Sequence, residues 1–139
     1  KLAKPKSETA HMNAQILALA FAGGALGTGL RVAIAELLDL GLDANASTLQ
    51  IVGLFIANVL GAAALGWFNG DERFATDARR AFWSTGFAGG FTTLSGVAIW
   101  LVVAEELSGA GIALIALQIL LGLDAYWLAR LAAKKRGRA

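Results

Sequence analysis

Cysteine is absent from the 139-residue sequence, and histidine, proline, methionine and tyrosine occur once each. The lack of cysteine excludes disulfide bonds and thiolate metal sites. The single histidine, His11, lies in a polar N-terminal segment, which argues against a histidine-based metal site or a serine–histidine catalytic pair. The sequence contains no recognisable set of nucleophile, base and orienting residue, and no phosphate-binding loop. An enzyme is therefore not predicted.

Charge is also scarce. Only 16% of the residues are charged, 57% are hydrophobic, and the mean hydropathy is +0.62. A typical soluble domain has about a quarter of its residues charged. A soluble helical bundle is the alternative, but its helices would each carry a polar face, and the apolar runs here leave no room for one. The composition therefore predicts a membrane protein whose surroundings are the lipid bilayer.

Four stretches are long and apolar enough to cross a bilayer core, which takes about 20 helical residues. They cover residues 14–38, 49–68, 81–107 and 112–133. The expected fold is an all-α membrane protein with four transmembrane helices in one domain, residues 12–133. Residues 1–11 are basic and polar, and we interpret them as a disordered tail or the remnant of an added leader, with Met12 as the natural start. Residues 134–139 are expected to form a basic cytoplasmic tail.

The basic residues are distributed unevenly among the connections. Those of the middle connection and the C-terminus are Arg73, Arg79, Arg80, Arg130, Lys134, Lys135, Arg136 and Arg138, whereas the first and third connections contain neither Lys nor Arg. The positive-inside rule then places both termini in the cytoplasm, in a multi-pass protein of the cytoplasmic membrane. Basic residues beside a membrane usually mark topology and contact anionic lipid, so no nucleic-acid partner is predicted.

Several polar side chains lie within the predicted spans, where they are costly and usually functional or packed against protein. Asn58 and Gln118 carry amides, which can donate to an anion or join two helices. Arg31 can extend to the membrane interface or hold an anion at a vestibule. Asp124 can pair with Arg31 or take part in proton coupling. The small residues of "GGALGTGL", which precede Arg31, indicate close helix packing.

The third span contains the stretch "GFAGGFTTLSGVAIW", residues 86–100. Its glycines permit a break in the helix, and its hydroxyl side chains can satisfy the freed backbone groups. These residues are Gly89, Gly90, Gly96, Thr92, Thr93 and Ser95. Helix breaks expose carbonyls that coordinate cations and helix N-termini that favour anions. The stretch therefore predicts an ion site, with simple glycine packing as the alternative.

Three motifs in order, "GGALGTGLR", "ANVLGAAALG" and "STGFAGGFTTLS", resemble those of the Fluc or CrcB family of small fluoride channels. The resemblance implies an antiparallel dimer that exports fluoride passively through pores lined by both subunits. It also implies a structural sodium ion held by the backbone carbonyls of Gly89 and Thr92. Arg31 matches the family's helix-one arginine. The positions that would line the pore are Asn58, Thr93, Leu94, Ser95, Val97 and Gln118.

The chain departs from the family pattern, which usually reads T-T-F-S-T-F with a glutamate three residues later. Leu94 and Val97 stand at the two phenylalanine positions, Gly96 replaces the threonine, and Trp100 replaces the glutamate. An aromatic ring presents a positive edge to an anion, which leucine and valine lack. Together with the charge bias, this favours one half of a heterodimer, whose inverted partner supplies the phenylalanines.

Two alternatives stay open. The chain could form a homodimeric channel with an altered or inactive pore, although its charge bias favours a single orientation. It could also resemble a small multidrug-type exporter, which needs a carboxylate embedded in the membrane. Glu36 lies near the end of the first span and Asp124 lies on the fourth, and neither has the sequence context of such an exporter.

Overall fold

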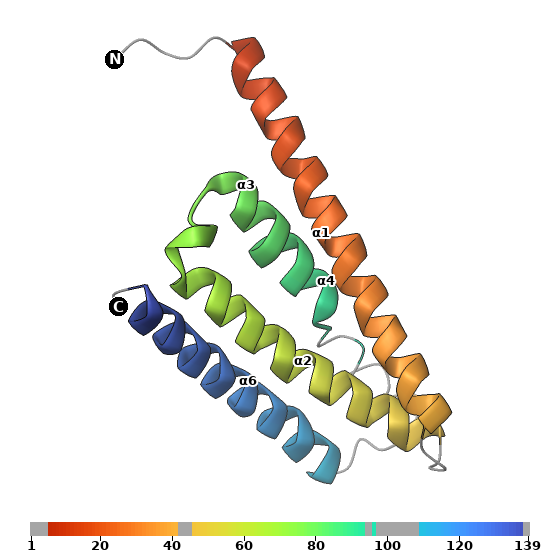
Figure 1. The fold of residues 1–139 in the computed structure, drawn as a ribbon. Helices are drawn as coiled ribbons and strands as arrows, with labels where there is room; N and C mark the ends of the chain where they lie inside the picture. Colours follow the sequence, from red (N-terminus) through yellow and green to blue (C-terminus); the bar gives the residue numbers. More distant parts are fainter. Residues whose placement is uncertain (1–5, 42–45, 94–95, 97–108, 138–139) are drawn as a thin grey trace.

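The computed structural model describes residues 6–41, 46–93, 96 and 109–137, with side chains over 13–38, 51–93, 96 and 112–137. The chain is helical almost throughout this part (Figure 1). The long helices are α1 (Lys6–Gly41), α2 (Ala46–Gly70) and α6 (Gly109–Arg136). Between α2 and α6 lie the 3-10 turn η1 (Glu72–Phe74), α3 (Asp77–Arg79), the π-helical η2 (Arg80–Ala88) and α4 (Gly89–Phe91). No strand occurs among these described residues, and the all-α prediction is confirmed.

Three helical segments are long and apolar enough to cross a membrane: Asn13–Leu38, Ile51–Gly70 and Ile112–Arg136. They correspond to the first, second and fourth predicted spans, and the membrane class is thereby supported. The third predicted span, 81–107, ends among residues outside the described part. Helix α1 already begins at Lys6, within the segment interpreted as a tail or an added leader, and the origin of residues 1–11 stays a prediction. No proline occurs from residue 6 onward, so nothing in the sequence interrupts the helical hydrogen bonds there.

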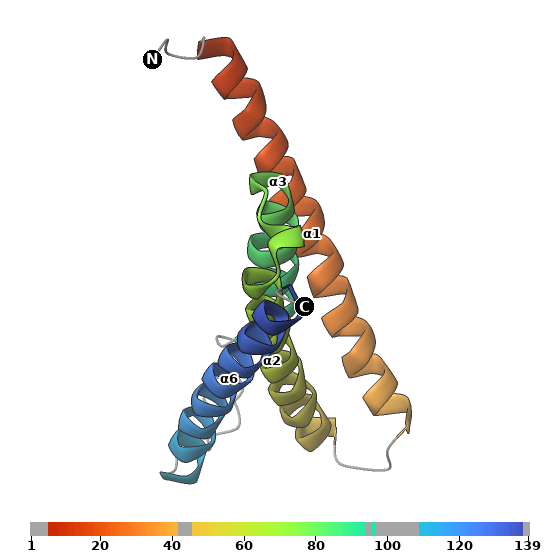
Figure 2. The same cartoon turned by 60° about the vertical axis from the view of Figure 1, so that its left-hand side comes forward.

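The helices are not arranged in chain order. The segment from α3 to α4 lies between α1 and α2, and α6 runs along the other side of α2 (Figures 1 and 2). The end of α1 nearest the N-terminus, the turn through η1 and the C-terminal end of α6 point toward one end of the bundle (Figure 1). The turn through η1 therefore lies at the same end of the bundle as the C-terminal end of α6 (Figure 1).

The contact of α1 with η2 and α4 depends on glycine. A Cβ added at Gly23 or Gly27 would collide with backbone atoms of η2, and one added at Gly86 or Gly90 would collide with the backbone of α1. Both pairs are spaced four residues apart, so they lie on one face of each helix. The packing predicted from "GGALGTGL" is confirmed at Gly23 and Gly27, whereas a Cβ at Gly29 would meet nothing within 4 Å.

A column of aromatic rings fixes the same segment against α2. Phe68 of α2 lies 4.9 Å from Phe74 and 5.3 Å from Trp83, measured between ring centroids. Trp83 lies 5.7 Å from Phe87, which stacks on Phe91 at 5.8 Å with an interplanar angle of 6°. Phe91 is buried and ends α4. The column therefore connects η1, at one end of the bundle, with the point where the helix stops.

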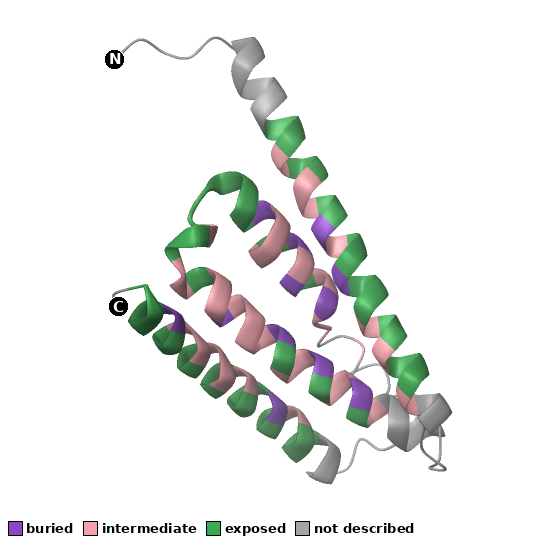
Figure 3. Cartoon of the chain, viewed as in Figure 1, coloured by how far each residue is buried: buried purple, intermediate pink, exposed green. Residues whose placement is uncertain are grey.

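The outer faces of the long helices remain apolar and exposed. Leu17 and Phe21 of α1 and Leu128 of α6 are 70%, 81% and 68% exposed. Figure 3 shows exposed residues along the outer sides of α1 and α6 and buried ones between the helices. Such faces suit contact with lipid or with another apolar protein surface.

Candidate ion site

The third helical segment stops at two threonines. Thr92 has an extended backbone, with φ −89° and ψ 149°. Its N–H still donates to the Ala88 carbonyl at 3.0 Å, and its hydroxyl donates to the same oxygen at 2.9 Å. Gly89 keeps helical dihedral angles of −66° and −38°. The chain thus leaves the helix at Thr92. Gly90, two residues earlier, is needed for close contact with α1 and not for the change of direction.

Asn58 of α2 bonds both backbone groups of Thr93. Its Nδ2 donates to the Thr93 carbonyl at 3.1 Å, and the Thr93 N–H donates to its Oδ1 at 2.6 Å. In a continuing helix, that N–H would donate to the Gly89 carbonyl. Asn58 therefore replaces the helical hydrogen bonds at the point where they are lost. The helix-joining interpretation of this asparagine is supported by these two bonds.

Two hydroxyl groups satisfy further backbone atoms near the break. Thr28 of α1 donates from Oγ1 to the Gly90 carbonyl at 3.2 Å. The Gly96 N–H donates to Thr93 Oγ1 at 3.1 Å, in the manner of a helix N-cap. The sequence interpretation did not identify Thr28. Its position in a run of small residues within a span was a usable signal, because threonine hydroxyls often re-satisfy freed backbone groups in membrane helices.

A cavity of about 450 Å³ lies between α2 and α6, beside Thr92. It is lined by Asn58, Ala62, Leu65, Thr92, Gln118, Ile119, Gly122, Leu123 and Tyr126. Gln118 is only 5% exposed, and its Nε2 has no hydrogen-bond partner in the described part of the chain. A buried amide without a partner is unusual, and its N–H groups can replace the hydration shell of an anion.

The structure thus brings together three residues that the sequence singled out: Asn58, Thr92 and Gln118. Thr93 lies beside them through its bonds to Asn58. Tyr126 lines the same cavity and was missed in the sequence interpretation. Its spacing of eight residues from Gln118 places both on one helix face, which was the available signal. Leu94, Ser95, Val97 and Trp100 lie outside the described residues, and their roles stay predictions.

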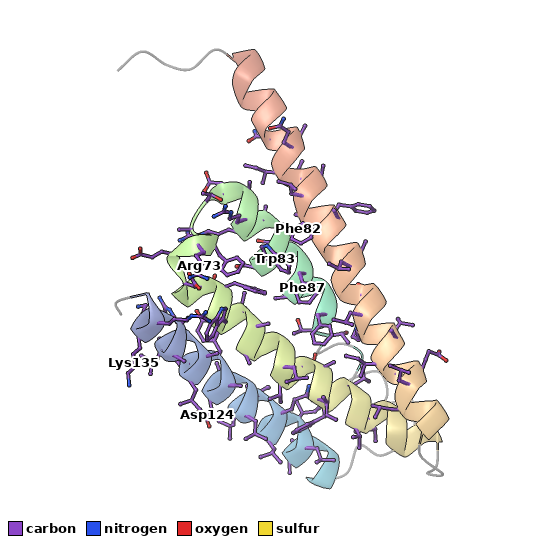
Figure 4. All side chains as sticks on the ribbon, viewed as in Figure 1. Arg73, Phe82, Trp83, Phe87, Asp124 and Lys135 are labelled. Carbon is purple, nitrogen blue, oxygen red and sulfur yellow. The ribbon has the colours of Figure 1, made fainter. Side chains whose placement is uncertain are left out.

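Arg31 lies elsewhere. It lines a separate cavity of about 250 Å³ with Val32, Ala35, Gly53 and Leu54, and its Nε is buried without a hydrogen-bond partner among the described residues. Asp124 is exposed on α6, and its side chain points away from α2 (Figure 4). Pairing with Arg31 was one of two roles left open for Asp124, and the structure does not bring the two residues together within the chain, because α1 and α6 lie on opposite sides of α2 (Figure 1).

The fit of a sodium ion can be tested on the donor atoms. Within the described part of the chain, no group of three or more histidine, cysteine or acidic side chains could hold a metal ion. The break instead offers backbone carbonyls, since the Thr93 N–H that a helix would direct to the Gly89 oxygen goes to Asn58. Neutral carbonyl oxygens suit a hard cation such as sodium. The residues present are therefore compatible with the carbonyl site expected at Gly89 and Thr92.

The described part of the chain is helical and apolar, its third helical segment ends at Phe91, and a mainly apolar cavity lined by two amide side chains lies beside that end. These features are typical of membrane proteins that hold polar groups between their helices. The family model for CrcB-like proteins, described as "Camphor Resistance (CrcB)", matches residues 18–130. The protein named fluoride-specific ion channel FluC 2 of Leifsonia xyli subsp. xyli is 35% identical over 137 residues, which cover 90% of this chain and 88% of that protein. A protein of the same name from Corynebacterium jeikeium is 41% identical over 95 residues, which cover 59% of this chain and 56% of that protein. No solved structure matches the chain significantly.

The chain therefore belongs to the CrcB-like protein family. The family resemblance found in the three sequence motifs is confirmed. These relatives are named as ion channels and not as enzymes, which agrees with the expectation that the chain is no enzyme.

Proposed function

We propose that this chain is a subunit of a fluoride-selective channel that lets fluoride leave the cytoplasm passively across the cytoplasmic membrane. The observation that carries this proposal is the cavity beside Thr92, where Gln118 Nε2 is buried without a hydrogen-bond partner among the described residues. The names of the two relatives supply the identity of the ion.

The residues divide into positioning groups and groups that face the ion. The Oδ1 and one N–H of Asn58 are hydrogen-bonded to Thr93, so its second N–H can face the cavity. Gln118 offers both of its N–H groups, and the hydroxyls of Thr93 and Ser95 add further polar contacts. Such groups must replace enough of the hydration shell to admit fluoride and must bind weakly enough to release it. Arg31, in its separate cavity, would attract anions from a vestibule or serve a structural role.

The complete channel is proposed to be an antiparallel dimer of subunits with four membrane helices, the third of them broken. The strong bias of basic residues toward one end gives this chain a single orientation, with both termini in the cytoplasm. An inverted homologous subunit would then be the partner, and its phenylalanines would compensate for Leu94 and Val97. A sodium ion held by the Gly89 and Thr92 carbonyls would contribute positive charge near the pores and hold the two subunits together.

Fluoride efflux from liposomes tests this proposal. The purified chain is reconstituted alone and then with its paralogous subunit, and efflux of fluoride is compared with efflux of chloride. We expect fluoride efflux only from the mixed vesicles, and we expect it to fall when Gln118→Leu replaces the native chain. No fluoride efflux in either preparation would reject the channel function.

A homodimer with an altered pore is the second candidate. It is favoured because one chain alone provides side-chain hydrogen bonds around the end of α4, from Thr28, Asn58 and Thr92. Fluoride efflux from the chain alone would establish this candidate and reject the need for a heterodimer.

A further inference from the structure

A third cavity, lined by charged and polar residues, lies at the end of the bundle where α6 ends. It measures about 260 Å³ and forms where η1, the start of η2 and the end of α6 meet. It is lined by Phe68, Asn69, Gly70, Asp71, Glu72, Ala75, Arg80, Lys134 and Gly137. The proposed fluoride site does not include any of these residues. The cavity therefore requires an explanation of its own.

The charges around this cavity are predominantly positive. The basic side chains of the surrounding segments are Arg73, Arg79, Arg80, Arg130, Lys134, Lys135 and Arg136, and the acidic ones are Asp71, Glu72 and Asp77. Figure 4 shows Arg73 and Lys135 at this end of the bundle. Asp71 is already engaged, because its Oδ1 accepts the Arg73 N–H at 2.9 Å. The side chains of Arg80 and Lys134 form no ion pair within the described part of the chain.

Tryptophans place this end of the molecule at the boundary between membrane and water. The guanidinium of Arg130 lies 5.3 Å from the centre of the Trp127 ring, and that of Arg136 lies 6.0 Å from the Trp67 ring. Tryptophan with adjacent basic residues is typical of the headgroup level of a bilayer. In a bilayer whose headgroup level coincides with these tryptophans, the cavity would open among the phospholipid headgroups.

We propose that this cavity binds the headgroup of an anionic phospholipid of the phosphatidylglycerol type. The phosphodiester would lie between Arg80 and Lys134, which come from different segments and both line the cavity. The two carboxylates, Asp71 and Glu72, would repel a second phosphate, and they can accept hydrogen bonds from the hydroxyls of a glycerol headgroup. The bound lipid would join the start of η2 to the end of α6. This inference goes beyond the proposed channel function and does not depend on it.

The chain offers a charge-matched control for each of the two basic lining residues, although the Arg79 side chain also donates to the Arg73 carbonyl. Arg80 and Lys134 line the cavity, whereas their neighbours Arg79 and Lys135 do not. The variant Arg80→Gln/Lys134→Gln and the control Arg79→Gln/Lys135→Gln lose the same charge from the same two segments. The shift in Tm of the detergent-solubilised full chain is titrated with phosphatidylglycerol, phosphatidylcholine and soluble glycerol phosphate. Native mass spectrometry of retained lipid provides a second readout.

Phosphatidylglycerol should raise the Tm of the native chain and of the control, and phosphatidylcholine and glycerol phosphate should not. The cavity variant should bind phosphatidylglycerol more weakly by on the order of tenfold. Arg80→Lys/Lys134→Arg should retain most of the response, and it also serves if the glutamine variant does not fold. An equal loss in the control variant would mean diffuse surface charge and would overturn the site. An equal effect of glycerol phosphate or phosphatidylcholine would overturn the assignment to an anionic lipid.

Discussion

Asn58 of α2 and Thr93, two residues beyond the end of α4, are joined by two hydrogen bonds of 2.6 Å and 3.1 Å. The sequence left two roles open for Asn58, joining helices and donating to an anion. One N–H and the carbonyl oxygen of its amide are used for the first role, and only the second N–H is left for the other. Asn58 therefore fixes the backbone of Thr93 where the chain has left the helix, and any contact of Asn58 with an ion depends on that geometry.

Replacing Asn58 by aspartate should destabilise the protein. Asn58→Asp keeps an acceptor for the Thr93 N–H, but it loses the donor to the Thr93 carbonyl and places two oxygens face to face. We expect a loss of about 1–3 kcal/mol, seen as a lower Tm in detergent. Asn69→Asp is the matched control on α2, because Asn69 is exposed and its Oδ1 accepts from the Ser84 hydroxyl. Equal Tm values for the two variants would contradict the role of Asn58 as a brace.

Replacing Gln118 by leucine should separate stability from conduction. Nothing in the described chain bonds Gln118 Nε2, so Gln118→Leu removes a buried polar group without breaking a bond. The Tm should stay the same or rise, whereas fluoride efflux should become about tenfold slower or more, because a hydrogen bond to the ion is lost. A fall in Tm with unchanged efflux would show that Gln118 is a packing residue.

Two adjacent glycines should respond differently to the same added methyl group. Gly90→Ala would push a Cβ into the backbone of Gly24, and overpacking of this kind costs about 1–3 kcal/mol. Gly89→Ala has open space and helical dihedral angles, so it should be neutral or stabilise by about 0.4–1 kcal/mol. Thermal unfolding of both variants measures the difference. Similar Tm values would be inconsistent with the close contact between α1 and α4.

Neutralising Asp124 should leave passive conduction unchanged. Asp124 is exposed on α6, it does not line the Asn58 cavity, and it forms no ion pair in the described part of the chain. Asp124→Asn should therefore keep both the Tm and the rate of fluoride efflux. The measurement is efflux at several imposed pH gradients. Loss of a pH-driven flux on this substitution would instead favour the proton-coupled exporter among the alternatives.

The approximate extent of three of the four expected apolar spans could be predicted from the sequence alone, and most of the third span, 81–107, stays a prediction beyond Phe91. The cost of burying unsatisfied backbone groups in lipid leaves the helix as the simplest solution for runs such as residues 51–70. The spacing of Gly23 and Gly27 likewise predicted close helix packing, because residues four apart share a face. A helix break at the glycines stays a prediction. In the described residues the chain leaves the helix at Thr92, and Gly90 lies in close contact with α1.

The sequence by itself determined that the chain is helical, apolar, free of cysteine and basic mainly in its middle connection and C-terminus, because each of these properties follows from local composition and periodicity. Only the tertiary structure decided which polar groups meet. Asn58 and Thr93 are 35 residues apart, and Thr28 and Gly90 are 62 apart. Their bonds depend on α1 and α2 lying on either side of the broken segment. The same arrangement separates Arg31 from Asp124, because α2 lies between α1 and α6 and opposite charge alone cannot bring the two helices together.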